Sequence, residues 1–257
     1  NTMPLQVITV PCLSDNYAFI LHETESRQTA VVDVPEAKPI LAALKDLGWS
    51  LDHILITHHH DDHIMGLEEV RAATGASVHG GAPDAYRLPP LDTQLSDGDT
   101  FQLGAESCRV IDVSGHTLGH IAFIFDEALA AFTADSLMAW GCGRVFEGTM
   151  DMQWATMQKF KDLPRAMTIY SGHEYTTSNG KFAMTVEPYN ESYQKRMVET
   201  NAARAKGEPT VPSNLGLELA TNPFLRASHP KLKAAIGMED ATDAEVFAEI
   251  RTRKDNF

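Results

Sequence analysis

The sequence is poor in cysteine and has no long apolar run. It contains three cysteines, Cys12, Cys108 and Cys142, among 257 residues. So sparse and odd a number argues against a disulfide framework and is typical of a reducing compartment. No apolar run approaches the roughly 18 residues that a membrane-spanning helix needs, and the first residues lack the basic stretch of a secretory signal. We therefore expect a cytoplasmic protein that does not bind membranes.

Basic residues are also scarce. The chain has 21 Lys and Arg against 35 Asp and Glu, a formal net charge of −14. A surface of this sign repels nucleic acid and acidic lipids, so we expect neither as a partner. It repels anionic small molecules too, and an anionic substrate would therefore need a local basic patch.

The order of the predicted elements indicates an α/β (α+β) protein with two domains. Short apolar segments predict strands at residues 6–10, 18–21, 30–34, 53–57, 108–113, 121–125, 128–134 and 166–171. Helical periodicity appears at residues 35–48, 66–75, 151–163, 193–207 and 242–254. The strands end before residue 173 and polar helices follow. We predict a mixed domain over residues 1–173 and a mainly helical domain over residues 174–257.

Side chains that can bind metal ions follow four of the predicted strands. The segment THHHDDH, residues 57–63, overlaps the end of strand 53–57. His116, Asp135 and His173 follow the strands at 108–113, 128–134 and 166–171. In sheets flanked by helices, functional groups gather in loops at strand ends, because the scaffold holds those loops still. We therefore expect these side chains to meet at one place.

The spacing within residues 57–63 predicts how two ions would share these side chains. Residues two apart in extended backbone point to the same side, so His58 and His60 can bind one ion while His59 points away. The chain then turns toward the helix at 66–75, which directs Asp62 and His63 toward a second ion. A carboxylate has two oxygens and can bridge. The expected sets are His58, His60 and His116 for one ion and Asp62, His63 and His173 for the other, bridged by Asp135.

Each of these residues has an ordinary explanation when it is taken alone. The three consecutive histidines could be a solvated surface cluster, and Asp135 could form an Asx-turn or cap a helix. Short motifs also arise by chance. The joint pattern after four strands favours the metal interpretation. Imidazole with carboxylate suits zinc, iron or manganese, and no thiolate belongs to the set.

The same segments resemble a known family. THHHDDH matches the T-H-x-H-x-D-H signature of the metallo-β-lactamase superfamily, and SGHTLGHI, FTADSL and YSGHEYT are similar to its later metal motifs. Within that superfamily the chain resembles the hydroxyacylglutathione hydrolase (glyoxalase II) family. The segments GCGRVFEG, KFAMTVEP, GEPTVPS, NPFLR and RTRKDNF carry that resemblance, which spans nearly the whole chain.

The resemblance implies an αββα sandwich followed by a helical domain that completes a thiol-substrate pocket. It implies the same seven metal ligands and two divalent metal ions, and it maps glutathione contacts onto Arg144, Tyr175, Arg251 and Lys254. The implied reaction is hydrolysis of S-D-lactoylglutathione by a hydroxide bridging the two ions and oriented by Asp62 and Asp135. This reaction is the second step of methylglyoxal detoxification.

Three features depart from the family pattern. Arg144 stands where Lys is usual, Phe146 stands where Tyr is common, and Ile-Met-Gly at 64–66 replaces a continuation of smaller residues. The first keeps the charge but changes the donor geometry, and the second removes a hydroxyl. These changes concern affinity for the thiol substrate and leave the hydrolytic centre intact.

Other functions fit the same ligand motif. A lactonase, a phosphodiesterase or a sulfur dioxygenase of the superfamily is the enzymatic alternative, and a non-catalytic metal-binding module is the other. The dioxygenase is expected to lack the second ligand set and the helical extension, and a module is expected to have lost ligands. The basic end RTRK at residues 251–254 could also be only a solvated helix end favoured by the helix dipole. We expect a monomer or a weak homodimer.

Overall fold

The computed structural model describes residues 4–257, and their strands fall into two sheets, β1 to β6 and β7 to β12. By spatial contact the chain divides into two compact units. Among the described residues, the first comprises residues 4–113 and 118–134, and the second comprises residues 114–117 and 135–257. No helix among the described residues is long and apolar enough to cross a membrane.

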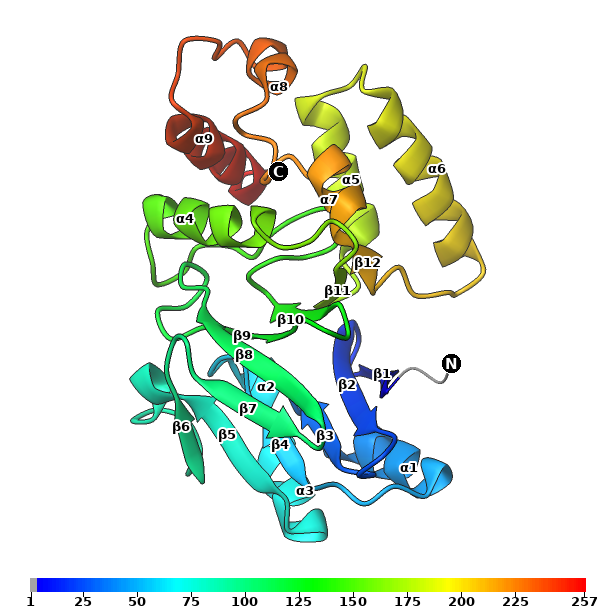
Figure 1. Cartoon of the computed structure of the whole chain (residues 1–257). Helices are drawn as coiled ribbons and strands as arrows, with labels where there is room; N and C mark the ends of the chain where they lie inside the picture. The colour runs from blue at the N-terminus through cyan, green and yellow to red at the C-terminus, as the bar shows by residue number, and fades with distance from the viewer. Residues whose placement is uncertain (1–3) are drawn as a thin grey trace. The chain divides into compact units, whose positions relative to one another are not determined.

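The first unit contains one sheet in the order β1-β2-β3-β4-β5-β6 (Figure 1). Its strands are β1 (Leu5–Cys12), β2 (Asn16–Glu23), β3 (Thr29–Val32), β4 (His53–Leu55), β5 (Ser77–Gly81) and β6 (Thr93–Leu95). The pairs from β1 to β3 are antiparallel and those from β3 to β6 are parallel. Most residues of β3, β4 and β5 are buried, because helices cover a face of such a sheet, whereas Thr93 and Gln94 of β6 are exposed.

Helices α1 (Ala37–Leu47) and α3 (Leu67–Thr74) pack on this sheet. Ile40 and Leu44 of α1 and Val70 of α3 share one buried cluster with Ile54 and Val78 of the strands. Gly48 ends α1 in the left-handed conformation, with φ of 68°, which glycine adopts without a steric penalty. The short helix α2 (Asp61–Ile64) and the turn η1 (Ala82–Asp84) lie in connections.

The first unit also contains an antiparallel meander from the second sheet. Its strands are β7 (Thr100–Leu103), β8 (Glu106–Asp112), β9 (Ile121–Phe125) and β10 (Ala130–Ala134). All residues of β9 and β10 are buried. Apolar residues of this kind stabilise the sheet by removing their surface from water.

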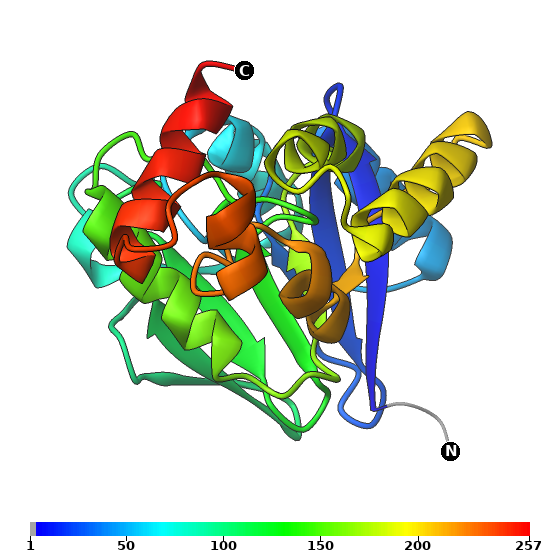
Figure 2. The same cartoon turned by 90° about the horizontal axis from the view of Figure 1, so that it is seen from above.

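The second unit is mainly helical. It contains α4 (Met150–Lys161), β11 (Thr168–Ser171), α5 (Thr176–Val186), α6 (Glu191–Ala205), β12 (Ser213–Asn214), α7 (Leu215–Thr221), α8 (Pro230–Ala235) and α9 (Asp243–Asp255). Helices α5 and α6 pack on each other, and so do α4 and α9 (Figures 1 and 2). Glu218 of α7 accepts hydrogen bonds from Arg196 of α6 and from the backbone N–H of Trp140, which joins α6, α7 and the 139–141 segment.

The strand and helix predictions made from the sequence are confirmed, and no predicted end differs from the observed one by more than two residues. The sequence pattern did not predict β5, β6, β7, β12, α2, α5, α7 or α8. The two compact units meet at different residues from the predicted division, which stays a prediction. The mixed class with two sheets and a helical C-terminal part is confirmed.

Candidate metal centre

The 57–63 segment leaves β4 in extended backbone and then turns into α2. His58 is 1% exposed and His63 is fully buried, whereas His60 and Asp62 are partly exposed. Burial of two imidazoles side by side, with their ring centroids 4.2 Å apart, requires partners for their nitrogens.

Asp33 supplies these partners within the first unit. Its carboxylate accepts hydrogen bonds from the Thr57 N–H at 2.8 Å, from the Thr57 hydroxyl at 2.7 Å and from Nδ1 of His63 at 2.8 Å. A carboxylate only accepts, so the His63 proton lies on Nδ1 and the lone pair on Nε2. The Thr57 hydroxyl donates its hydrogen bond to Asp33. The hydroxyl oxygen of Thr57 therefore acts as the acceptor for Nδ1 of His58, at 2.9 Å. Both rings therefore present Nε2 as a candidate ligand atom.

Asn16 fixes Asp62 in the same unit. Its amide Nδ2 donates to the Asp62 carbonyl oxygen and to Oδ2, both at 3.0 Å. The sequence carries no motif that marks Asn16 or Asp33 as functional residues. Asp33 follows β3 in the way the expected ligands follow their strands, so the end of that strand was the available signal. Its φ of 61° is left-handed, which Asp tolerates better than most residues.

Three of the expected ligands lie in the second unit. Oδ2 of Asp135 is 3.3 Å from Nε2 of His116, and Oδ1 is 3.3 Å from Nε2 of His173. Each oxygen of one carboxylate thus faces a different imidazole. Nδ1 of His116 donates to the carbonyl oxygen of Arg144 at 2.6 Å, which again leaves Nε2 with the lone pair.

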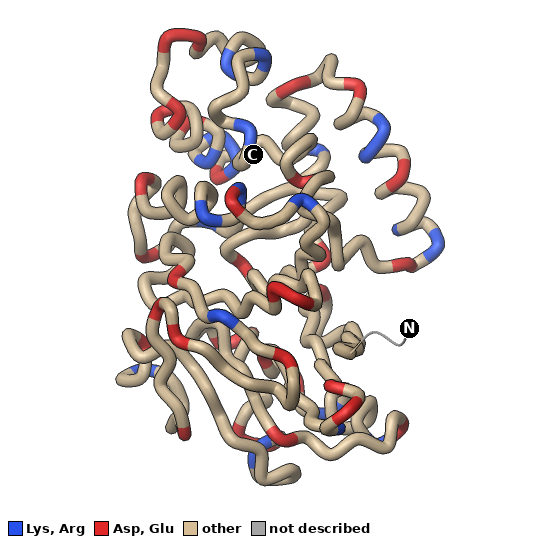
Figure 3. The backbone as a smooth tube through the Cα atoms, viewed as in Figure 1, with Lys and Arg blue, Asp and Glu red and all other residues tan. Residues whose placement is uncertain are grey.

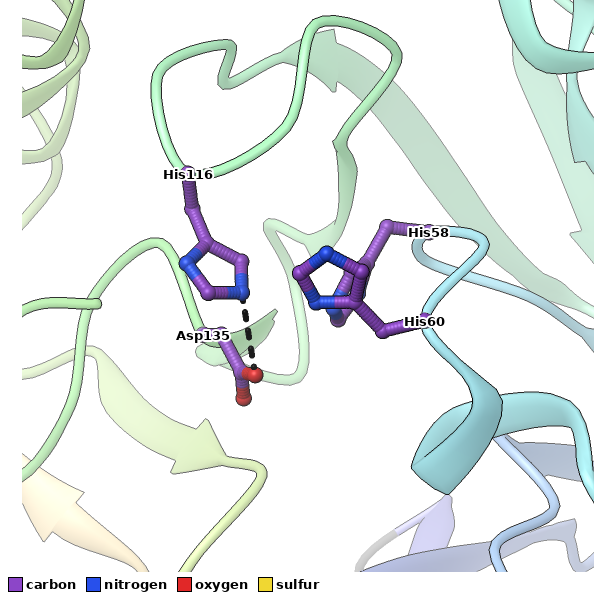
Figure 4. Close-up of side chains that lie close together, drawn as sticks. All are labelled: His58, His60, His116 and Asp135. Carbon is purple, nitrogen blue, oxygen red and sulfur yellow. Dashed lines mark ion pairs between the residues drawn. The ribbon is translucent and has the colours of Figure 1, made fainter. Parts of the chain in front are cut away.

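The candidate ligand atoms fall into two groups that share Asp135, and within each group the atoms lie within 4.8 Å of one another. The groups are His58, His60, His116 and Asp135, and Asp62, His63, Asp135 and His173. Figure 4 shows the first group, with the dashed line between His116 and Asp135. A donor set of imidazoles and carboxylates fits divalent metal ions such as zinc, iron or manganese.

The other histidines have different positions. His120 is buried and stacks on His58 with ring centroids 4.4 Å apart. Nδ1 of His53 and Nε2 of His79 form a hydrogen bond, and both rings pack against the ring of Phe101. His22 stacks on Trp49, and the side chain of His229 caps α8.

The four residues implied as glutathione contacts all lie in the second unit. Tyr175 is 37% exposed and its ring stacks on His173, with centroids 4.5 Å apart and an interplanar angle of 6°. Arg144 has a side chain that is 55% exposed, whereas that of Arg251 is only 5% exposed. The amine of Lys254 lies over the rings of Phe182 and Phe257. Burial, followed by the charge of Arg251, lowers the pKa of that amine.

A solvated helix end accounts for only part of the basic segment at 251–254. Arg253 fits that description, because it is exposed and pairs with Glu249 one turn earlier. Arg251 does not, because it is buried and bonded to Cys142 and Asp255.

The charge is unevenly distributed along the chain (Figure 3). Residues 1–134 contain 6 Lys and Arg and 19 Asp and Glu, a net charge of −13, while residues 135–257 contain 15 and 16, a net charge of −1. The anion-repelling character thus belongs to the first part. The second part is close to neutral and can form a local basic patch.

Comparison with known proteins supports the family resemblance that the sequence motifs indicate, along nearly the whole chain. Residues 21–173 match the family model described as metallo-beta-lactamase superfamily, and residues 174–257 match the model described as hydroxyacylglutathione hydrolase C-terminus. The chain is 59% identical to a hydroxyacylglutathione hydrolase of Cereibacter sphaeroides over 255 residues, which is 99% of this chain and 100% of that protein.

A second relative and a solved structure agree. A hydroxyacylglutathione hydrolase of Roseobacter denitrificans is 53% identical over 255 residues, again 99% of this chain and 100% of that protein. The crystal structure of BLEG-1 B3 metallo-beta-lactamase superposes with a TM-score of 0.66 at 19% identity, over 86% of this chain and 99% of that chain. The structural likeness establishes the metallo-β-lactamase fold, with its two sheets and helices.

Proposed function

Because the chain belongs to the hydroxyacylglutathione hydrolase family of the metallo-β-lactamase superfamily, we propose that it hydrolyses the thioester of S-(2-hydroxyacyl)glutathione. S-D-lactoylglutathione is the expected substrate, and D-lactate and glutathione are the expected products. The protein is a metal-dependent hydrolase. The observation that carries the proposal is the pair of ligand groups sharing Asp135, which suits a binuclear divalent site. We propose zinc as the occupant, with iron or manganese as the alternatives.

Two bound divalent ions would supply Lewis acidity, which lowers the pKa of water and stabilises negative charge on the thioester carbonyl oxygen. The residues of the chain supply orientation. Asp33 and Thr57 hold His58 and His63 with Nε2 available, and the Arg144 carbonyl does the same for His116. Fixed ligands of this kind keep the site from reorganising during the reaction.

We propose that Asp135 and Asp62 orient the attacking water. Asp135 offers one oxygen toward each of two imidazoles, and Asn16 prevents Asp62 from rotating away. Both carboxylates also accept hydrogen bonds, which would align the proton of the water. The leaving thiolate of glutathione is only moderately basic, so the reaction requires no strong general acid.

We propose that Arg144, Tyr175, Arg251 and Lys254 form the glutathione end of the site within a substrate-binding domain of residues 174–257 and the loop 141–148. The near-neutral charge of residues 135–257 supports this, because an anionic peptide would meet little repulsion there. Phe146 is 61% exposed beside His116, at 5.4 Å between ring centroids. It offers an apolar face where the family commonly has a hydroxyl.

His116→Ala tests the proposal. This substitution removes a ligand and leaves Asp135 with one imidazole partner, so we expect metal content per chain below that of the wild type. We also expect hydrolysis of S-D-lactoylglutathione to fall by at least about 100-fold, as loss of electrostatic stabilisation does. Elemental analysis and loss of thioester absorbance measure the two effects. His229→Asn, far from the ligand groups in sequence, is the control. Full turnover by a metal-depleted His116→Ala protein would refute the mechanism.

A further inference from the structure

Asp255 lies in the last turn of α9, where two arginines share its carboxylate. Oδ1 accepts hydrogen bonds from Nε and Nη2 of Arg251, at 3.2 and 2.9 Å. The same oxygen lies 3.7 Å from Nε of Arg144, in the loop 141–148. Since the Arg251 side chain is 5% exposed and that of Arg144 is 55% exposed, the carboxylate links a buried cation to an exposed one.

Arg251 is held on both sides by the protein. Its remaining terminal nitrogen, Nη1, donates to the carbonyl oxygen of Cys142 at 2.6 Å, and its guanidinium lies over the ring of Phe224. A buried guanidinium is stable only with a counter-charge and satisfied donors. Asp255 is that counter-charge, so the attachment of Arg251 to Cys142 depends on Asp255.

The residues next to Cys142 reach the metal ligands. A Cβ atom at Gly143 would lie 2.8 Å from Nδ1 of His116 and 2.3 Å from the carbonyl oxygen of Asp135. The carbonyl oxygen of the next residue, Arg144, accepts a hydrogen bond from Nδ1 of His116. Its guanidinium lies 5.8 Å from the centroid of the Phe146 ring. One short segment therefore orients a candidate metal ligand and presents a cation to solvent.

We propose that Asp255 is a positioning residue for the hydrolysis. It holds Arg251, which fixes the segment 142–144, and it braces Arg144 directly, so that the cation for the carboxylate end of glutathione keeps a fixed place relative to His116. A guanidinium held in advance loses less freedom when the substrate binds. This inference rests on the proposed function, because it assumes an anionic thiol substrate.

Asp255→Asn tests this role by removing the charge at nearly constant size. Charge-assisted hydrogen bonds are worth more than neutral ones, so we expect KM for S-D-lactoylglutathione to rise about tenfold, with kcat within about twofold of the wild type. The Kd of S-hexylglutathione, measured by calorimetry, should rise by the same factor. KM for S-lactoyl-N-acetylcysteamine, a neutral thioester without the peptide carboxylates, should stay within about twofold. Asp240→Asn, an exposed carboxylate in the same unit, is the matched control.

A double variant separates positioning from a merely structural role. If Asp255 acts through Arg144, then Asp255→Asn and Arg144→Gln will be non-additive, and the double variant will resemble Arg144→Gln alone for the glutathione substrate. Should Asp255→Asn fail to fold, Asp255→Glu keeps the charge but displaces it, and a smaller rise in KM confined to the glutathione substrate is expected.

Four results would overturn the inference: an unchanged KM, an equal rise in KM for both thioesters, additive effects in the double variant, or no binding of S-hexylglutathione by the wild type. Failure of the proposed function looks different. In that case the wild type cleaves neither thioester, and the comparison of S-hexylglutathione affinities between wild type and Asp255→Asn still decides the role of Asp255.

Discussion

Asp33 holds two candidate ligands at once, His63 directly and His58 through Thr57. We expect Asp33→Asn to lower metal affinity about 10- to 100-fold, as loss of a group that orients metal ligands does. An amide has one oxygen for three donors, and its NH2 group opposes the Nδ1 proton of His63. Asn tolerates the left-handed backbone at this position, so the effect reports the carboxylate and not backbone strain.

Competition with a chromophoric chelator measures this loss of affinity. Asp46→Asn, an exposed carboxylate on α1, is the matched control and should bind metal as the wild type does. Equal affinities in Asp33→Asn and the wild type would mean that Thr57 and the surrounding core orient the two rings without the charge.

At the scale of residues, the sequence predicts the candidate metal ligands, which lie in recognisable motifs. It predicts less well the residues that hold those ligands in place. The alternation of His58 and His60 and the ends of later strands pointed to the expected ligands. Asp33 and Asn16 carry no motif, because their role depends on a contact made 24 to 46 residues away. The sequence does not predict the burial of Arg251 either, because every residue of the RTRK segment is polar.

At the scale of elements, α9 carries Arg251, Lys254 and Asp255 near its C-terminal end. The stability of this helix depends on how its N-terminal end is capped. The Thr242 hydroxyl accepts a hydrogen bond from the N–H of Glu245, and the Glu245 carboxylate accepts one from the N–H of Thr242. These two bonds form a capping box at the start of the helix. We expect Thr242→Ala to lower the free energy of unfolding by about 1 kcal/mol. Urea unfolding followed by circular dichroism measures it.

Thr252→Ala is the control for this prediction. It makes the same chemical change at an exposed position inside α9, where alanine is the better helix former, so stability should stay equal or rise slightly. If the two variants lose the same free energy, the capping box contributes nothing to stability.

The elements that the sequence predicted are those with a clear period or an apolar run, such as α1 and β9. Four of the missed elements, β5, β6, α7 and α8, have identifiable reasons. Strand β5 contains two glycines and β6 has only three residues, so neither shows an alternating pattern. Helices α7 and α8 are short, at seven and six residues, and their stability comes from tertiary packing, which a local pattern does not show.

For the molecule as a whole, the pair formed by half-buried His53 and buried His79 links folding to pH. Nδ1 of His53 lies 3.0 Å from Nε2 of His79, and both rings pack on Phe101. Burial, followed by the neighbouring His53, lowers the pKa of His79 to about 4, against the attraction of Asp92. Burial likewise lowers the pKa of His53, against the attraction of Asp52.

The unfolded chain holds more protons on these two rings than the native state does in mild acid. The unfolded chain binds protons at these rings near pH 6.5, whereas the native state resists protonation of His79 until about pH 4. The stabilisation from neutral burial is therefore complete above pH 6.5 and is lost as the pH falls from 6.5 toward 4. We expect His79→Leu to flatten the decline of unfolding free energy over this window, by up to about 1.4 kcal/mol per pH unit for the one proton removed.

Urea unfolding of the metal-loaded protein at a series of pH values measures this slope, because the metal ligands contribute equally to the wild type and to the variant. His229→Asn is the control, since Asn keeps a helix-capping oxygen at the start of α8 while removing an imidazole outside the pair.

The slope of unfolding free energy against pH decides the outcome. The absolute stability of His79→Leu does not matter, because a lost hydrogen bond shifts the whole curve without changing its slope. Parallel curves for His79→Leu and the wild type between pH 6.5 and about 4 would show that His79 takes up no proton on unfolding. Any acid sensitivity of the fold would then have to arise from His53, the candidate metal ligands or the carboxylates.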